Sequence, residues 1–291
     1  LSLEINGYPL AFLDSGASAQ KPNQVLDRMD RAYRSEYANV HRGAYTLSQL
    51  ATDNYENARL TVANFLNAKT PDEIVFTRNV TAAINLVAYS YGRTYLSAGD
   101  EVIISHMEHH ANIVPWQLLR DAIGIEIKVV PIDECGNFLM EEFKKLLGPK
   151  TKLVAVTQVS NVLGTILPVK EIVQQAHNVG AHVLIDGCQG VVHEGVDVQD
   201  LDAEFYAFTG HKLYGPSGIG VLWGKLDLLN SMPPYEGGGD MIENVTFEKT
   251  TYREAPARFE AGTPPIVEAV GLAAAIDYVK SIGLENIANH E

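Results

Sequence analysis

Between residues 72 and 224 the chain alternates short apolar runs with segments of helical periodicity, and this rhythm limits the fold more than any other feature. The runs predicted to be strands are Ile74–Phe76, Glu101–Ser105, Ile125–Ile132, Leu153–Gln158, His182–Asp186, Glu204–Phe208 and Ile219–Trp223. Near-continuous apolar strands are typical of a sheet that is covered on both faces. We therefore expect an α/β fold, with a mostly parallel sheet sandwiched by helices.

Helices are predicted between the strands, with others before and after them. The segments with helical spacing are Thr81–Tyr89, Val114–Ile123, Phe138–Leu147 and Val169–Val179, with a longer amphipathic pattern at Ser48–Asn67 and a last helix at Val267–Ile282. Gly124 and Gly180 each follow a predicted helix, where glycine is a common terminator. The last helix is expected to leave one face uncovered. The stretch from Pro233 to Pro265 is expected to be irregular and to carry function or interface contacts.

Charge and cysteine content argue against several classes of protein. A formal net charge of -14 opposes binding along a nucleic-acid backbone. The chain has only 2 cysteines, Cys135 and Cys188, so a disulfide framework is not expected. The apolar stretches are too short and interrupted to span a membrane, and no signal region is recognised. We expect a cytoplasmic protein, or one in an organelle after removal of a transit peptide.

Three polar residues follow three separate predicted strands. Asp186 closes one strand, Lys212 follows the next, and Thr81 opens a helix after the first. Ligands of open α/β sheets bind at such strand ends. A lysine can hold a cofactor aldehyde as a Schiff base, a carboxylate can keep a pyridine nitrogen protonated, and a helix N-terminus suits a phosphate. Each residue alone has an ordinary structural explanation, but together they predict a site for pyridoxal 5′-phosphate.

The segment from His106 to His110 has two alternative interpretations. A metal site is disfavoured, because the His-Glu-x-x-His pattern is absent and no further carboxylate or thiolate ligand lies nearby in sequence. A histidine after the Glu101–Ser105 strand can instead lie over a flat cofactor ring and move a proton at neutral pH. A structural role for His110 stays open. No metal is predicted.

Several motifs run in order along nearly the whole chain. They are Leu13-Asp14-Ser15, Gln20-Lys21-Pro22, residues 39–43, residues 107–116, residues 159–164, Asp186-Gly187-Cys188-Gln189, Thr209-Gly210-His211-Lys212 and residues 258–264. By these motifs the chain resembles the SufS-type cysteine desulfurases and the related selenocysteine lyases, in the class V branch of fold-type I pyridoxal phosphate enzymes. The fold implied is that of the fold-type I transferases.

The resemblance implies a role for each candidate residue. Lys212 would bind the cofactor aldehyde, Asp186 would pair with the ring nitrogen, and His109 would stack on the ring. Gln189 and Asn161 would lie near the phenolic oxygen and the substrate, while Thr81, Thr209 and His211 would hold the phosphate. Arg42 would border the substrate entrance, and Thr263 would reach the phosphate of the neighbouring subunit in a homodimer.

The resemblance also implies a division of the chain. Residues 1–265 would be an N-terminal arm and the cofactor-binding large domain, and residues 266–291 a connecting helix towards a small domain not present in this chain. In the family, that small domain brings the persulfide-forming cysteine and an arginine that binds the substrate carboxylate. Neither Cys135 nor Cys188 is expected to replace that cysteine. We therefore expect this chain to bind the cofactor and to release essentially no alanine or sulfide.

The activity implied for the family member is conversion of L-cysteine to L-alanine and an enzyme persulfide, for iron–sulfur cluster assembly through a sulfur-acceptor protein. The alternatives are a selenocysteine lyase, another class V reaction such as a β-elimination, and a cofactor-binding scaffold without turnover. Neither nucleic acid nor a membrane is expected as a partner.

Overall fold

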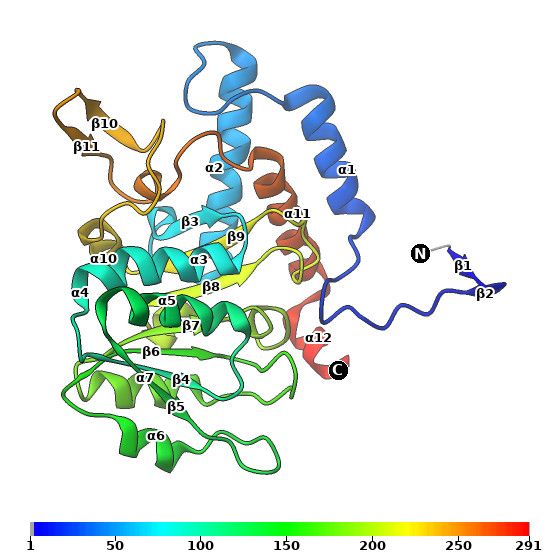
Figure 1. Ribbon diagram of the computed structural model, residues 1–291. Helices are drawn as coiled ribbons and strands as arrows, with labels where there is room; N and C mark the ends of the chain where they lie inside the picture. The colour runs from blue at the N-terminus through cyan, green and yellow to red at the C-terminus, as the bar shows by residue number, and fades with distance from the viewer. Residues whose placement is uncertain (1–2, 291) are drawn as a thin grey trace.

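The computed structural model describes residues 3–290, in which a seven-stranded sheet lies between layers of helices (Figure 1). The sheet contains β3 (Ile74–Thr77), β4 (Glu101–Ser105), β5 (Glu126–Val130), β6 (Thr151–Thr157), β7 (His182–Asp186), β8 (Phe205–Thr209) and β9 (Gly220–Gly224). Two small hairpins lie outside it, formed by β1 (Glu4–Ile5) with β2 (Tyr8–Pro9) and by β10 (Ile242–Val245) with β11 (Thr250–Tyr252).

The helices are α1 (Asn23–Arg31), α2 (Thr46–Leu66), α3 (Val80–Leu86), α4 (Arg93–Tyr95), α5 (Val114–Ile123), α6 (Met140–Leu146), α7 (Val169–His177), α8 (Gly190–His193), α9 (Val198–Leu201), α10 (Leu226–Ser231), α11 (Ile266–Ile282) and α12 (Leu284–His290). A π-helical segment, Val87–Gly92, continues α3 into α4. Among residues 3–290, no helix is long and apolar enough to cross a membrane.

The strand order in the sheet is β3-β9-β8-β7-β6-β4-β5. Neighbouring strands from β5 to β8 are parallel, whereas β9 runs antiparallel to both β8 and β3. The predicted α/β fold with a mostly parallel sheet is confirmed, and β9 is its reversed strand. The carboxyl ends of β4, β6, β7 and β8 therefore meet at one edge, as the sequence predicts for its polar strand-end residues.

The sheet is buried on both faces because its strands alternate between two cores. In β6, Val154 and Val156 pack with α2, α7 and α11 on one face, and Leu153 and Ala155 pack with α3 and α5 on the other. All four side chains are fully inaccessible to solvent. Burial of both alternating sets explains why the strands show continuous apolar runs.

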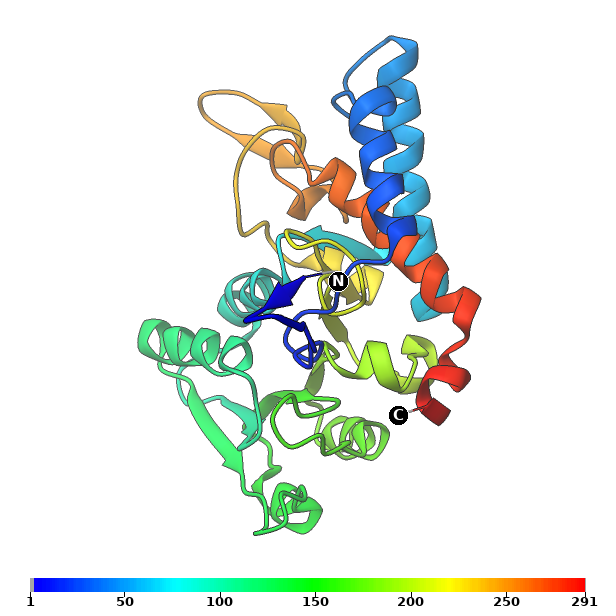
Figure 2. The ribbon, with the colours of Figure 1, turned by 90° about the vertical axis from the view of Figure 1, so that its right-hand side faces the viewer.

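The α11 helix is covered, so the predicted uncovered face is wrong. Helices α1 and α2 both pack along α11 (Figure 2). Met29 and Ala32 from the α1 region contact Val267 and Val270 in a small third core. The exposed residues of α11 gather near its end and are mainly polar, as at Asp277 and Lys280. Helices from the N-terminal region thus bury the face of α11 that its own sequence pattern leaves without a partner.

The sequence prediction missed several elements, including α1 and the β10–β11 hairpin. No helix or strand was predicted for residues 23–31, where the α1 helix lies, and of the residues in this helix Val25 is buried. The β10–β11 hairpin interrupts the stretch expected to be irregular and projects from the body of the molecule (Figure 1). Phe247 at its tip and the nearby Val245 are exposed. Both elements lack the long apolar run that predicts a buried strand or helix.

Candidate active site

A cavity of about 550 Å³ opens where β4, β6, β7 and β8 end, beside the start of α3. Eight of the ten predicted site residues line it: Thr81, His109, Asn161, Asp186, Gln189, Thr209, His211 and Lys212. Arg42 and Thr263 do not. A larger cavity of about 980 Å³ contains neither Lys212 nor Asp186. The smaller cavity is therefore the candidate active site.

Asp186 places a buried carboxyl group at the end of β7, with only 3% of the residue exposed. Its Oδ1 accepts the backbone N–H of Cys188 at 3.1 Å. Burial raises the pKa of this carboxyl group, although hydrogen bonds from Cys188 lower it. In the described part of the chain no lysine or arginine forms an ion pair with it. Such a group fits a protonated ring nitrogen, which would supply the missing positive charge.

The turn after Asp186 requires a glycine at position 187. A β carbon on Gly187 would lie 1.9 Å from the ring of Tyr206, which packs behind the turn. The Tyr206 hydroxyl donates to Gln158 Oε1 at 2.7 Å. This contact fixes the backbone from which Asp186, Cys188 and Gln189 face the cavity.

Lys212 lies in a tight turn between β8 and β9. The Gly210 N–H donates to the Ile219 carbonyl and the Gly215 N–H donates to the Gly210 carbonyl, both at 2.9 Å. These two bonds close the base of the turn. The Lys212 side chain is half-buried and lines the same cavity as Asp186 and His109.

His109 follows β4 and begins a short 3-10 turn, His110–Asn112. Its Nδ1 accepts the backbone N–H of Ala111 at 3.1 Å. Since Nδ1 accepts a hydrogen bond, the neutral ring carries its proton on Nε2. Burial and then the positive charge of Lys212 lower the pKa of His109. The ring is therefore neutral at physiological pH and has Nε2–H as its free donor.

The opposite end of the cavity is formed by the start of α3. Asn79 caps this helix, because its side chain accepts the Ala82 N–H at 2.9 Å. Thr81, predicted to open the helix, lies in the first turn and lines the cavity. A β carbon on Gly220 would lie 2.4 Å from the Asn79 carbonyl carbon. Glycine on β9 thus lets the helix start approach the sheet, where its N–H groups suit a phosphate.

Within an N-terminal segment, residues 13–21, the cavity is lined by Leu13, Asp14, Gly16 and Ala17. Gln189 Nε2 donates to the Gly16 carbonyl at 3.0 Å, and the Ala19 N–H donates to the His211 carbonyl at 3.1 Å. Lys21 donates to both Ala19 and His211 carbonyl oxygens. Asp14 and Lys21 belong to the motifs noted in the sequence, without a predicted role. Gly16 and Ala17 line the cavity although nothing in their local sequence pattern predicts it.

The two cysteines lie in different environments. Cys188 lines the cavity but is only 5% exposed, and burial followed by the nearby Asp186 charge raises the pKa of its thiol. It is therefore a protonated, packed side chain. Cys135 is exposed in a turn held by Asp133, whose Oδ1 accepts the Cys135 N–H at 2.9 Å. Among residues 3–290, no group of three or more His, Cys, Asp and Glu side chains is placed to hold a metal ion.

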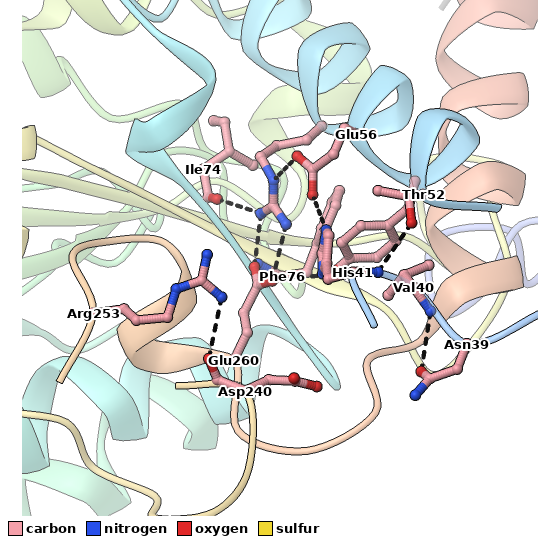
Figure 3. A network of polar contacts seen from close by, with 12 residues as sticks. Asn39, Val40, His41, Thr52, Glu56, Ile74, Phe76, Asp240, Arg253 and Glu260 are labelled. Atoms are coloured by element: carbon pink, nitrogen blue, oxygen red, sulfur yellow. Dashed lines mark hydrogen bonds and ion pairs between the residues drawn. The ribbon is translucent and has the colours of Figure 1, made fainter. Parts of the chain in front are cut away.

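A polar network that includes Glu56, Asp240 and Glu260 lines the larger cavity (Figure 3). Arg42 and Thr263 adjoin residues of this cavity in the chain. Arg42 forms an ion pair with Asp240, and the Gly262 N–H donates to the Gly239 carbonyl at 3.0 Å. Thr263 itself is exposed, between two residues that line this cavity. These two predicted residues therefore adjoin the larger cavity and do not line the cavity that contains Lys212.

The centre of this network is a buried ion pair between Arg59 and Glu260. Arg59 Nη1 and Nη2 donate to the two carboxylate oxygens of Glu260 at 2.7 and 2.9 Å. The same carboxylate accepts the Phe76 N–H at 2.7 Å and the Tyr55 hydroxyl at 3.0 Å. Burial alone lowers the pKa of Arg59, but the charge of Glu260 holds it well above its ordinary value. The pair ties α2 and β3 to the segment that carries Thr263.

The family model for "Aminotransferase class-V" matches residues 11–291. A "Cysteine desulfurase" of Pectobacterium atrosepticum is 56% identical over all of this chain, which spans 72% of that protein's length. The solved structures include an apo cysteine desulfurase of Thermococcus onnurineus, 40% identical with a TM-score of 0.91, covering 95% of this chain and 68% of that one. They also include a cysteine desulfurase of Escherichia coli, 42% identical with a TM-score of 0.88, covering 94% of this chain and 69% of that one.

Proposed function

Because this chain belongs to the class-V aminotransferase family, we propose that the protein is a pyridoxal 5′-phosphate-dependent cysteine desulfurase. It converts L-cysteine to L-alanine and transfers the sulfur to a protein thiol as a persulfide, from which an acceptor protein takes it for iron–sulfur cluster assembly. The observation that carries the proposal is the convergence of Lys212, Asp186 and His109 on one cavity, from the ends of three strands.

The residues of the cavity fit the cofactor group by group. Lys212 presents the amine that would hold the aldehyde, and the buried Asp186 carboxylate would pair with the ring nitrogen. His109 lines the same cavity, and its ring would cover the flat ring of the cofactor. The start of α3 with Thr81, and Thr209 and His211 beyond β8, would hold the phosphate. When bound, the cofactor supplies an electron-accepting ring that stabilises negative charge on the substrate carbon next to nitrogen.

The side chains around the cavity have separate tasks in this reaction. The buried Asp186 carboxylate would stabilise a positive charge on the ring nitrogen beside it. His109 presents Nε2–H as a hydrogen-bond donor, since Ala111 occupies Nδ1. Gln189 and Asn161 add amide groups near the expected substrate position. The Lys212 amine would remove and return the proton on the substrate carbon.

We propose in addition that two copies form a homodimer in which Thr263 and Arg42 of one subunit serve the cavity of the other. The support is their position: both are exposed and neither lines the cavity of its own chain. Cofactor retention should then fall as the protein is diluted. A fully loaded protein that sediments as a monomer would contradict this arrangement.

Borohydride reduction tests the central assignment. The cofactor-loaded protein should acquire one covalent pyridoxyl group, and peptide mass mapping should locate it on Lys212. The Lys212→Ala variant should lose both the label and the visible absorption band, whereas Lys225→Ala, remote from the cavity, should retain both. A label on another lysine would refute the assignment. Parallel assays with L-cysteine and L-selenocysteine, measuring alanine, would separate desulfurase from selenocysteine lyase.

A further inference from the structure

Glu108 is a buried acid next to the active-site cavity that no contact with the cofactor would explain. The residue is 8% exposed and is not among those lining the cavity. Its carboxylate accepts hydrogen bonds from Ser105 Oγ at 2.5 Å, Asn112 Nδ2 at 2.7 Å and the Thr157 backbone N–H at 3.1 Å. None of these donors is a cation. Burial accordingly raises the pKa of Glu108 to about 7, although its hydrogen bonds lower it.

The hydrogen bonds from Trp116, Asn112 and Thr157 in this cluster have fixed directions. The indole N–H of Trp116 can only donate, and it donates to Asn112 Oδ1 at 3.0 Å. The amide of Asn112 must then turn its NH₂ group towards Glu108. The Thr157 N–H is likewise only a donor. Since Asn112 and Trp116 are fully inaccessible and Ser105 is 1% exposed, solvent does not offer these groups other partners. The cluster therefore requires acceptors at both oxygens of residue 108.

These bonds hold the loop that carries His109 at three points. Ser105 is the last residue of β4, Asn112 ends the 3-10 turn, and Thr157 is the last residue of the neighbouring strand β6. Within the loop, the Asn112 N–H donates to the His109 carbonyl at 2.8 Å. The Ala111 N–H, one residue earlier, donates to His109 Nδ1. The contacts of Glu108 thus fix the same backbone that sets the ring position of His109.

From this geometry we infer that Glu108 is a positioning residue for His109. By accepting three hydrogen bonds it fastens the loop of residues 105–112 against the end of β6, and this keeps the Ala111 N–H on His109 Nδ1 and the ring proton on Nε2. The ring is then held at the cavity with its donor already oriented. The relevance to catalysis rests on the function proposed above, but the effect on the ring itself does not.

The donor and acceptor pattern allows a pair of variants that separate positioning from general stability. Glu108→Gln replaces one acceptor oxygen with an NH₂ group of almost the same size. In one orientation of the glutamine amide, its NH₂ group faces the NH₂ group of Asn112, and in the other it faces the Thr157 N–H. If the Asn112 amide rotates instead, its own NH₂ group faces the Trp116 N–H. Each arrangement therefore sets two donors against each other. In the double variant Glu108→Gln/Asn112→Asp, the introduced glutamine donates to the introduced carboxylate, which still accepts from Trp116. The hydrogen bond between residues 108 and 112 is restored, with donor and acceptor exchanged.

Glu73→Gln is the matched control. Glu73 is a buried acid, 4% exposed, that accepts the Trp223 indole N–H at 3.0 Å and the Lys69 backbone N–H at 2.9 Å. It therefore has the same kinds of neutral donors as Glu108, and it is not among the residues of the active-site cavity. Both donors reach the same oxygen of Glu73, so the introduced glutamine can still accept them, and this variant shows only the cost of replacing a buried carboxyl group with an amide.

Two measurements on these variants test the inference. In the cofactor-free protein labelled with ¹⁵N-histidine, NMR gives the tautomer and the pKa of His109, with His109→Asn identifying its signals. Equilibrium binding of pyridoxal 5′-phosphate, followed by absorbance, gives the affinity of the cavity. Glu108→Gln should mix the two ring tautomers, move the His109 pKa up towards its ordinary value and weaken cofactor binding by about tenfold, the size of one lost buried hydrogen bond. The double variant should restore all three, and Glu73→Gln should change none.

Two results would overturn the inference. The first is a Glu108→Gln protein that is destabilised but keeps the parent His109 tautomer and pKa. The second is a double variant that behaves no better than the single one. If all variants and the parent fail to bind the cofactor, the proposed function is refuted, while the NMR measurement still decides the role of Glu108.

Discussion

Replacing Glu260 with glutamine would remove the charge that neutralises the buried guanidinium group of Arg59. Arg59 is 2% exposed, and both of its Nη atoms are bound to Glu260. Breaking one partner of a buried pair typically costs about 3–5 kcal/mol of unfolding free energy. We expect the lower end, about 3 kcal/mol, because Glu56 still accepts from Arg59 Nε at 3.0 Å and glutamine keeps the shape of the site.

The reverse change, Arg59→Met, should cost a similar amount, because it leaves Glu260 charged with only the Tyr55 hydroxyl and the Phe76 N–H as donors. The double variant Arg59→Met/Glu260→Gln removes both charges together. It should lose about 3 kcal/mol rather than the additive value of about 6 kcal/mol, since neither group is left as an uncompensated charge.

Urea unfolding followed by circular dichroism measures these differences. With a slope of about 3 kcal/mol per molar urea, each single variant should unfold about 1 M earlier than the parent, and the double variant at nearly the same midpoint as the singles. As a control, Asp30→Asn breaks the exposed ion pair with Arg34 and should leave the midpoint unchanged. A double variant whose midpoint falls by about 2 M would show that the two charges act independently, and the reasoning would then be wrong.

Three further predictions concern the active site and the polar network. Asp186→Asn should keep the fold but slow exchange of the substrate Cα proton by tenfold or more, since each pKa unit lost at the ring nitrogen corresponds to about 1.4 kcal/mol, and unchanged exchange measured by NMR would exclude its role. The parent chain should bind the cofactor and release essentially no alanine, and Cys188→Ser should change neither result, because the Cys188 thiol is buried and protonated; alanine release by the parent that Cys188→Ser abolishes would make Cys188 the reactive thiol. Glu56→Gln should reduce the amount of unfolding free energy that the protein loses when the pH is lowered. Although burial raises the pKa of Glu56, the His41 hydrogen bond and the Arg59 charge lower it from 4.5 to about 2, so its stabilisation is present above pH 4.5 and disappears as the pH falls towards 2. Because this side chain is 43% exposed, the effect should be about 1 kcal/mol, and parallel acid-unfolding curves for parent and variant would contradict it.

The strands and the main cavity residues could be predicted because they depend on local patterns. The β7 and β4 boundaries agree with their apolar runs, and the placement of Asp186 and Lys212 at one edge follows from parallel strands ending together. The reversed direction of β9 carries no such local signal. It depends on the tight turn after Lys212, which brings the chain back beside β8.

Contacts between distant segments could not be predicted in this way. The Arg59–Glu260 pair joins residues 201 positions apart, and the bond from Thr157 to Glu108 spans 49 positions. A sequence pattern shows that an acid is present but not which donors the fold will bring to it. The α1 helix was missed for a similar reason, because its partners Val267 and Val270 lie near the other end of the chain.

The pairing of β3 with β9 has a consequence for synthesis of the chain on the ribosome. Among residues 3–290, the only sheet partner of β3, which ends at Thr77, is a strand that begins at Gly220. At about 5–20 residues per second, the ribosome needs roughly 7 to 30 seconds to make the intervening segment. During that interval the apolar run Ile74-Val75-Phe76 has no strand beside it, so the nascent chain exposes an unpaired edge suited to aggregation. A chaperone that binds short apolar segments should therefore associate with this chain while its first third is already complete and its last third is not yet made.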